Sequence, residues 1–364
     1  MAKKVLKGVV AVIIVLVVLV AGYVAYMLAT YNRIPDGITL DVENNQSPKL
    51  ETGKEYSAVT YNIGFGAYRP DYSFFMDEGV MEDGAKTQGE SSWAKSKESV
   101  EEATAGDINA IKSLDVDFAL LQEVDFGSTR SYQVNQVSAI QDAFPNMGSV
   151  EAVDYHSSFL FYPFTQPHGF ANSSLLTLSS AKIDSAVRRS YPVSDSLSKF
   201  TDLDRCFSVQ RIPVKGGADL VLINHHMSAY DKGGTTRAQQ LKMIGEFLTE
   251  ESKKGNYVVM GGDFNHALFG STGIYSSKQQ VPSWIATLDE KDLPKGFSLV
   301  KPSNLKDVAT CRGADIPYEK GVNYTSTIDG FIVSDNVKAT AQNIDLDFAY
   351  SDHNPVKLTF ELEK

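Results

Sequence analysis

Cysteine is nearly absent from this sequence: Cys206 and Cys311 are the only two in 364 residues. Two cysteines cannot build the disulfide framework of a small secreted domain, although a single disulfide between them is compatible with a location outside the cell. Histidine is also scarce, with six residues. No group of Cys and His has the spacing of a zinc site, so the sequence argues against bound zinc.

The chain also lacks positive charge, with 34 Lys and Arg against 45 Asp and Glu. Lys3, Lys4 and Lys7 are the only charges in the first thirty residues, and removing these three from the net charge of −11 leaves −14 for the remainder. So acidic a domain lacks the electrostatic footprint of a tight nucleic-acid binder. A local basic groove can coexist with overall acidity, so nucleic acid remains a less favoured partner.

Internal repeats and low-complexity tracts are absent, and 43% of the residues are hydrophobic, which is enough for a large core. The uncharged run from Val9 to Leu28 is about as long as the ~20 residues that cross a bilayer as a helix. The preceding lysines place the N-terminus in the cytoplasm and the rest of the chain outside. A cleaved signal peptide is the alternative, but its apolar core is usually only about 7–15 residues. We therefore expect a retained signal-anchor and a single-pass protein of the cell membrane.

Three regions are expected along the chain: the cytoplasmic stub and anchor at 1–30, a polar linker at 31–54 with room for an early edge strand, and one catalytic domain at 55–364. Short apolar runs bounded by turn residues predict strands in that domain, and longer amphipathic stretches predict helices. The strands are expected at 57–62, 117–122, 158–162, 173–178, 205–212, 219–224, 257–262, 328–333 and 355–361, and the helices at 96–114, 131–143 and 235–252. Helices punctuate the strands without strict alternation, which indicates a mixed α/β layered domain.

A long connection, residues 64–95, interrupts this pattern. It begins with Gly64 and carries Tyr68, Tyr72, Phe74 and Phe75. Connections of this length in compact domains are often functional. We keep two interpretations open: a loop whose aromatic side chains pack locally, and a loop that controls access of substrate.

Polar side chains stand at the ends of several predicted strands, where α/β folds collect their ligands and catalysts. Each one alone is compatible with an ordinary turn. The stretches VTYNIG, LLQEVD, INHHMSA, GGDFN, TIDGFIVS and SDHNPV occur in this order between Val59 and Val356. Taken together they resemble the endonuclease/exonuclease/phosphatase superfamily, which includes DNase I-like nucleases, inositol-polyphosphate 5-phosphatases and secreted neutral sphingomyelinases. The resemblance implies a four-layer α/β sandwich of two packed mixed sheets flanked by helices.

The resemblance also implies a metal site of hard oxygen ligands, which suits Mg²⁺, with Mn²⁺ as a substitute. Glu123 matches the family's principal ligand. Asn62 lies beside it in the family's metal site, and Asp352 completes the set.

Five further residues match catalytic positions of the family. His353 matches the catalytic histidine, and Asp329 matches the carboxylate that orients it. Asp263 and Asn265 match the residues that orient or deprotonate the attacking water and bind a phosphoryl oxygen. Either Asp263 or the pair of His353 and Asp329 is the general base, and we favour the pair. His226 would donate to the phosphate as charge grows in the transition state.

Strand parity separates the two adjacent histidines, since Asn224 and His226 share one face while His225 points to the other. We expect His225 to be hydrogen-bonded in the layer behind the site. Arg130 and Asn172 are candidate substrate contacts, because Arg suits bidentate binding of phosphate, although a surface arginine and a turn asparagine are equally compatible with the pattern. His266 is a weaker candidate for the rim of the site.

The motifs indicate the reaction more closely than the substrate. We expect a monomeric, membrane-tethered, Mg²⁺-dependent hydrolase of phosphoric esters that acts outside the cytoplasm on a lipid headgroup or a small phosphoester. A membrane-tethered DNase I-like nuclease is the alternative, although the long 64–95 segment and Gly64, at a position that is acidic in some nucleases, argue against cleavage at abasic sites. A third interpretation is a binding module without activity. The intact set of site residues makes it the least favoured.

Overall fold

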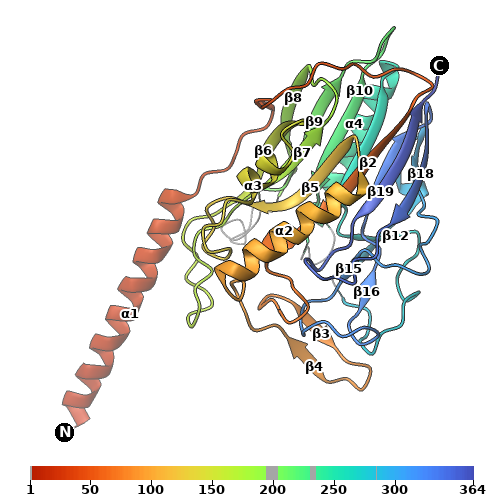
Figure 1. Ribbon diagram of the computed structural model, residues 1–364. Helices are drawn as coiled ribbons and strands as arrows, with labels where there is room; N and C mark the ends of the chain where they lie inside the picture. Colours follow the sequence, from red (N-terminus) through yellow and green to blue (C-terminus); the bar gives the residue numbers. More distant parts are fainter. Residues whose placement is uncertain (1, 194–203, 230–234, 284) are drawn as a thin grey trace.

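Two mixed β-sheets pack face to face in the computed structural model, which describes residues 2–193, 204–229, 235–283 and 285–364 (Figure 1). The seven-stranded sheet has the order β1 (Ile38–Thr39), β8 (Ser185–Ser190), β9 (Cys206–Ile212), β10 (Leu220–His226), β11 (Tyr257–Asp263), β17 (Asp329–Ser334) and β14 (Phe297–Leu299). The six-stranded sheet has the order β18 (Val337–Asn343), β19 (Val356–Leu362), β2 (Glu55–Asn62), β5 (Phe118–Asp125), β7 (Asn172–Ser179) and β6 (Gly148–His156).

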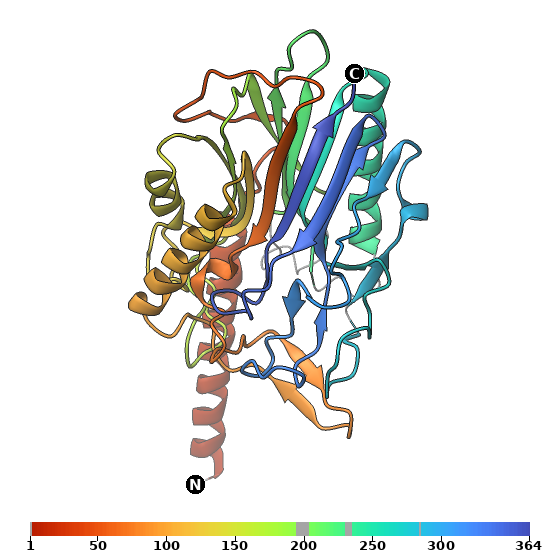
Figure 2. The same cartoon turned by 45° about the vertical axis from the view of Figure 1, so that its right-hand side comes forward.

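Helices cover the outer faces of both sheets (Figure 2). α2 (Lys97–Leu114) and α3 (Gln136–Ala143) lie over the six-stranded sheet, where Ile111 and Ile140 join its outward-facing core. α4 (Thr235–Lys253) lies over the seven-stranded sheet through its stripe of Leu241, Ile244 and Leu248. A third core fills the space between the sheets. The predicted four-layer α/β sandwich is therefore confirmed.

Each sheet contains one parallel pair of strands near its centre, β2 with β5 and β10 with β11. The other neighbours within the two large sheets run antiparallel. The two parallel pairs are tied together across the interface, because Gln122 Nε2 on β5 donates to Asn224 Oδ1 on β10 at 2.7 Å. The carboxyl ends of four strands, two from each sheet, thereby meet at one end of the sandwich, where α/β folds place their sites.

Most of the predicted elements are present, with boundaries shifted by a residue or a few. The strand expected at 158–162 is wrong: this segment makes only an isolated bridge between Leu160 and Gly169. β6, β8, β14 and β18 were not predicted, and three of these are edge strands, which show weaker apolar patterns. The 64–95 connection contains a short 3-10 helix, η1 (Gly64–Gly66), and a small hairpin of β3 (Glu78–Val80) and β4 (Lys86–Gln88).

Short elements complete the fold near the site. β12 (His266–Leu268) pairs with β13 (Ala286–Leu288), and β15 (Cys311–Arg312) pairs with β16 (Thr325–Ser326). A 3-10 turn, η3, covers Glu290–Asp292. Cys206 is buried in β9 and Cys311 is partly exposed in β15, and both thiols of these two described residues are free. The single disulfide that the sequence allowed is not formed.

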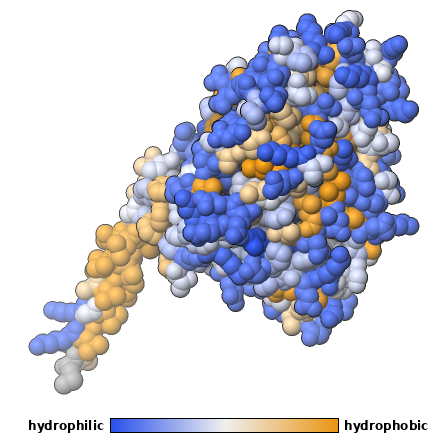
Figure 3. Space-filling view, viewed as in Figure 1, coloured by the Kyte–Doolittle hydropathy of each residue, from blue (hydrophilic) through white to orange (hydrophobic). Residues whose placement is uncertain are grey.

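Most of the N-terminal helix α1 (Ala2–Thr30) extends away from the domain, and its surface is apolar except at the N-terminal end (Figure 3). Its most apolar window has a mean hydropathy of 3.0 and none of it is buried, so the helix is long and apolar enough to cross a membrane; a signal sequence would satisfy the same criteria. Residues 31–54, expected as a linker, run along the domain. Within them β1 pairs with β8, and Leu50 enters the core between the sheets.

Candidate active site

Glu123 owes its direction to an irregularity in β5. The register between β5 and β7 shifts between Leu121 and Val124, and Glu123 has a φ of 53° inside this bulge. A bulge turns a side chain out of the alternating pattern of a strand, and such bulges are common beside active sites. The Glu123 carboxylate is therefore directed into the space between the strand ends, and its neighbours on β5 remain buried.

Asn62 ends β2 and links the metal-site candidate on β5 to the carboxylate on β11. Its side-chain amide donates to Glu123 Oε1 at 3.4 Å and to Asp263 Oδ2 at 3.1 Å. The side-chain oxygen of Asn62, Oδ1, accepts from the backbone N–H of Gly64 at 3.0 Å and so holds the start of the following turn. Asn62 is thus buried at the meeting point of both sheets, next to Glu123 as predicted.

His226 ends β10 and is held between two carboxylates. Its Nε2 lies 3.3 Å from Asp263 Oδ2, and its Nδ1 lies 3.5 Å from Asp154 Oδ2. Arg205 Nη1 lies 2.8 Å from Asp154 Oδ2 and 2.8 Å from His226 Nδ1. Burial and Arg205 alone would lower the pKa of His226, but Asp263 and Asp154 outweigh them and raise it.

The proton on Nε2 of His226 is present in both protonation states that these contacts allow. When the ring is neutral, Nδ1 accepts from Arg205 and the hydrogen is on Nε2. When the ring is protonated, Nδ1 donates toward Asp154 and Nε2 again carries a hydrogen. Because Nε2 faces Asp263 and Glu123, at 3.3 and 4.0 Å, His226 presents a hydrogen-bond donor to the site in either state.

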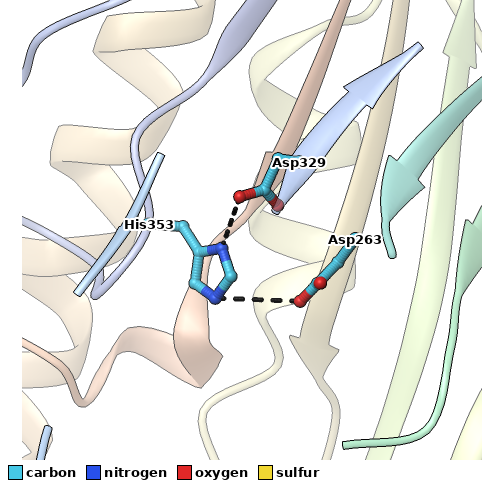
Figure 4. Close-up of side chains that lie close together, drawn as sticks. All are labelled: Asp263, Asp329 and His353. Atoms are coloured by element: carbon cyan, nitrogen blue, oxygen red, sulfur yellow. Dashed lines mark hydrogen bonds and ion pairs between the residues drawn. The ribbon is translucent and has the colours of Figure 1, made fainter. Parts of the chain in front are cut away.

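The side chains of His353, Asp329 and Asp263 lie close together, and each ring nitrogen of His353 faces one of the two carboxylates (Figure 4). His353 Nδ1 lies 2.9 Å from Asp329 Oδ2, and its Nε2 lies 3.7 Å from Asp263 Oδ2. Burial alone would lower the pKa of His353, but the Asp329 carboxylate reverses this and raises it well above its usual value. Burial would raise the pKa of Asp263, but His226 and His353 outweigh it and lower the pKa below its usual range.

Two groups of residues have the composition of a metal site. Asp263, Asp329 and His353 bring one ligand atom each within 4.8 Å of one another. In that group, however, Nδ1 of the imidazole is bound to Asp329, which is the arrangement of an orienting pair. Glu123 and Asp352 both reach the cavity described below and offer only oxygen, which suits Mg²⁺ better. Burial raises the pKa of Asp352, and the Glu123 carboxylate adds to that rise.

Asn265 has a φ of 48° and takes part in the turn after β11. Its backbone N–H donates to Asp263 Oδ1 at 2.8 Å, and its side-chain amide donates to Met227 O at 2.9 Å.

His225 points to the opposite side of β10, and its ring lies edge-on to Phe264 with 4.2 Å between centroids. Neither nitrogen of His225 has a hydrogen-bond partner among the described residues, so the expected hydrogen bond is wrong. Burial lowers its pKa to about 3, which keeps the ring neutral.

These side chains surround a cavity of about 570 Å³, within the range of ligand-binding pockets. Its wall includes seven of the candidate residues: Glu123, Arg130, His226, Asp263, Asn265, Asp352 and His353. Asn62 and Asp329 lie directly behind them and contact Asp263 and His353. The 64–95 segment supplies part of the wall with Phe74 and Met76. It therefore packs its aromatic side chains locally and also forms part of the cavity wall.

Arg130 lines the cavity and is not a surface arginine. Its Nε and Nη2 bind the two oxygens of Asp125 at 3.0 and 2.8 Å, and its guanidinium lies 3.7 Å from the centre of the Phe65 ring. Asn172 does not reach the cavity wall, because its side chain donates to Gly127 O at 3.4 Å. His266 is buried with Nδ1 2.6 Å from Phe264 O, and it too is outside the wall.

Three residues that shape this site were not predicted from the sequence. Arg205 and Asp154 hold His226, and Arg312 lines the cavity while donating to Tyr68 O at 2.9 Å. Arg312 follows Cys311, which forms an isolated bridge with His353. No strand-end pattern marks these residues, although a buried arginine inside a predicted strand, as at the start of 205–212, is an unusual signal that needs a charged partner.

No protein-family model matches the sequence, and no curated protein does. Solved structures do match. A crystal structure described as an endonuclease/exonuclease/phosphatase from Beutenbergia cavernae is 14% identical with a TM-score of 0.56, over 85% of this chain and 72% of that one. ANGEL2, described as a 2′,3′-cyclic phosphatase, is 15% identical with a TM-score of 0.53, over 90% and 99% of the two chains.

TDP2 from D. rerio, solved with a single-strand DNA product, is 13% identical with a TM-score of 0.52, over 85% of this chain and 99% of that one. Identities this low establish the fold alone. The chain has the endonuclease/exonuclease/phosphatase fold, as the motifs between Val59 and Val356 indicated.

Proposed function

We propose that the chain is a Mg²⁺-dependent hydrolase of phosphoric esters, tethered to the cell membrane by α1 with its domain outside the cytoplasm. One observation carries this proposal. A single carboxylate oxygen, Asp263 Oδ2, lies 3.3 Å from His226 Nε2 and 3.7 Å from His353 Nε2 at the wall of the cavity. Three buried arginines, Arg130, Arg205 and Arg312, line the same cavity and suit a phosphate group.

Glu123 and Asp352 are the residues that would hold the metal, with Asn62 beside Glu123. Their carboxylates face one cavity, and burial raises the pKa of Asp352, with a smaller contribution from Glu123. A cation bound there would offset the cost of holding these negative charges in a buried site. Mg²⁺ takes one or two protein carboxylates and keeps several waters, which fits this small set, and Mn²⁺ has similar preferences. Bound there, the metal supplies charge neutralisation for the phosphoryl group.

We assign proton transfer to the pair of His353 and Asp329. Because Asp329 holds Nδ1, Nε2 of His353 is directed toward Asp263 and the cavity. Asp263 and Asn265 then position the attacking water. His226 presents the hydrogen on Nε2 to the phosphoryl oxygens, where negative charge increases during the reaction. General acid–base groups of this kind contribute roughly a hundred-fold to ten-thousand-fold in rate.

The size of the cavity and the charge of the chain favour a small phosphoester or lipid headgroup as the substrate. The 64–95 segment forms part of the cavity wall with apolar side chains such as Phe74 and Met76, and the chain outside the anchor carries an excess of acids. A nuclease is the second candidate, because a protein of the same fold, TDP2 from D. rerio, was solved with a single-strand DNA product.

Assays with two substrates test the proposal and separate its alternatives. We expect the purified full chain to hydrolyse bis-p-nitrophenyl phosphate with Mg²⁺, to lose this activity in EDTA, and to leave supercoiled plasmid intact. His353→Ala should reduce turnover at least about a hundred-fold. His156→Ala is the matched control, since His156 is outside the cavity wall and pairs with Asp204. Plasmid nicking that His353→Ala abolishes would establish the nuclease instead, and failure to hydrolyse either substrate would reject both.

A further inference from the structure

The segment 157–170, between β6 and β7, exposes aromatic side chains and carries no charge. Its sequence, SSFLFYPFTQPHGF, contains no Asp, Glu, Lys or Arg in a chain with a net charge of −11. Four of its rings are well exposed: Phe161 at 48%, Tyr162 at 61%, Phe164 at 84% and Phe170 at 46%. Soluble surfaces rarely gather large apolar side chains in one place, and those that do usually mark a site of association.

This aromatic loop, residues 157–170, is attached to the C-terminal part of α1 (Figures 1 and 2). Tyr26 Oη accepts from the backbone N–H of Phe159 at 3.1 Å, and Tyr23 Oη donates to the carbonyl oxygen of Phe159 at 3.3 Å. The Tyr23 ring also packs edge-on to Phe161, with 5.2 Å between centroids. The loop therefore lies beside the last two turns of the apolar helix.

The depth of these contacts along α1 identifies the surroundings of the loop. The uncharged run ends near Leu28, so Tyr23 lies about five residues, or roughly 7 Å along the axis, inside that run. In a membrane-spanning helix, tyrosines at such a level sit in the interface between headgroups and acyl chains. The aromatic loop shares this level, and an uncharged aromatic surface suits the interface, whereas a protein partner would be expected to require a rim of polar and charged groups.

A chain of aromatic rings connects the loop to the cavity. The Phe75 ring lies 5.9 Å from Tyr162 and 5.9 Å from His168, and the His168 ring lies 6.2 Å from Phe74. Phe74, His168 and the 46% exposed Met76 line the cavity. An apolar path thus runs from the exposed rings of the loop to the wall of the candidate active site. A water-soluble phosphoester would have no use for such a path, whereas a lipid would.

We propose that the aromatic loop, residues 157–170, inserts into the outer interface of the same bilayer that α1 crosses, and that the cavity takes its phosphoester from a lipid of that surface. This inference rests on the proposed function for the reaction and on α1 for the tether. It adds a second membrane contact, which fixes the orientation of the domain, and it selects a lipid headgroup over a soluble phosphoester as the substrate class.

The first experiment locates the loop directly. The full chain carrying Phe164→Trp is reconstituted into vesicles of phosphatidylcholine and phosphatidylglycerol, and its emission is measured relative to the parent chain with and without acyl-brominated phosphatidylcholine. We expect a blue-shifted emission that brominated lipid quenches. Lys253→Trp, exposed at the end of α4 remote from the strand ends of the site, is the matched control and should remain unquenched. Equal and negligible quenching at both positions would overturn the proposal.

A second experiment separates failure of this proposal from failure of the proposed function. Phe164→Ser, in the same vesicles, should release lipid phosphorus several-fold more slowly than the parent chain. Hydrolysis of soluble bis-p-nitrophenyl phosphate should be unchanged, because Phe164 does not line the cavity. Equal rates of lipid hydrolysis in the two chains would overturn the delivery of a lipid through the loop. If the parent chain itself does not hydrolyse bis-p-nitrophenyl phosphate, the proposed hydrolase function is rejected instead.

Discussion

Two adjacent histidines on β10 experience opposite environments because successive residues of a strand face opposite sides. His226 lies among Asp154, Asp263 and Glu123, where its pKa is raised. His225 lies against Phe264 in the layer between β10 and α4, where burial lowers its pKa to about 3. Identical side chains are thereby separated into a hydrogen-bonded group with a raised pKa at the cavity and a neutral ring in the core.

We expect His226→Ala and His225→Ala to fail in different ways. His226→Ala removes the donor on Nε2, so turnover should fall at least about a hundred-fold, as for the loss of a donor to a developing oxyanion. His225→Ala leaves a cavity against Phe264 and should lower the free energy of unfolding by about 2–4 kcal/mol while retaining most activity. Turnover and thermal unfolding of both variants make the comparison. Equal catalytic losses in two folded variants would contradict the assignment.

The side chain of Glu251 connects the helix α4 to the seven-stranded sheet. Its carboxylate accepts from Arg211 of β9 at 2.7 and 3.0 Å, and from Lys254 and Asn256 at the end of the helix. Burial alone would raise its pKa, but the hydrogen bonds from Arg211, Lys254 and Asn256 outweigh it and lower the pKa to about 2. A carboxyl with a lowered pKa stabilises the fold while it is ionised.

The pH dependence of that stabilisation has a definite sign. Because the pKa is lower in the folded chain than its ordinary value of 4.5, the contribution of Glu251 is present above pH 4.5 and is lost as the pH falls toward about 2. Glu251→Gln should lower the free energy of unfolding by about 1.5 kcal/mol at neutral pH, since the pair is partly screened by water. The substitution should also reduce the decrease in the free energy of unfolding between pH 4.5 and about pH 2.

Thermal unfolding of the detergent-solubilised chain between pH 7 and pH 2 measures this effect. Glu246→Gln on the same helix is the matched control, because Glu246 is exposed and its ion-pair partner, Lys242, lies 3.9 Å away. That control should follow the parent chain. If the loss of thermal stability at low pH is the same in Glu251→Gln and in the parent chain, ionisation of Glu251 does not contribute to the stability of the fold.

Whether a strand could be predicted from the sequence depended on its position at the centre or the edge of a sheet. The strongly apolar central strands and the amphipathic helices α2 and α4 could be predicted from periodicity. β6 and β18 could not, because they are edge strands whose polar residues obscure the alternation. The 158–162 segment shows the opposite error: its apolar residues suggest a strand, yet Phe161 and Tyr162 are exposed beside α1.

At the scale of the whole molecule, the anchor and the site lie toward the same end. α1 leaves the domain on the side where the strands that carry the candidate residues end (Figure 2). With Lys3, Lys4 and Lys7 in the cytoplasm, the cavity would be held close to the outer surface of the membrane. The orientation of the chain therefore decides which pool of substrate the site can reach.

We expect a tag after Lys364 to be removed by protease added to sealed spheroplasts that express the chain, and a tag at the N-terminus to survive. Lys364 is exposed, so folding does not protect a tag placed there. Permeabilised spheroplasts, in which both tags should be lost, are the control. Survival of the C-terminal tag until permeabilisation would place the domain in the cytoplasm, and a shortened chain without the N-terminal tag would indicate a cleaved signal peptide.

The sequence by itself determined the fold class, the apolar N-terminal run and the polar residues that end the strands, because these depend on local periodicity and on motifs of a few residues. Only the tertiary structure decided which of those residues meet. Asp263 lies between His226 and His353, and Arg205 with Asp154 holds His226, through contacts between residues as far apart as 90 positions. Strand pairing within the seven-stranded sheet places His226 beside Asp263, and packing of the six-stranded sheet on it brings Asp154 to His226. No local pattern encodes these contacts.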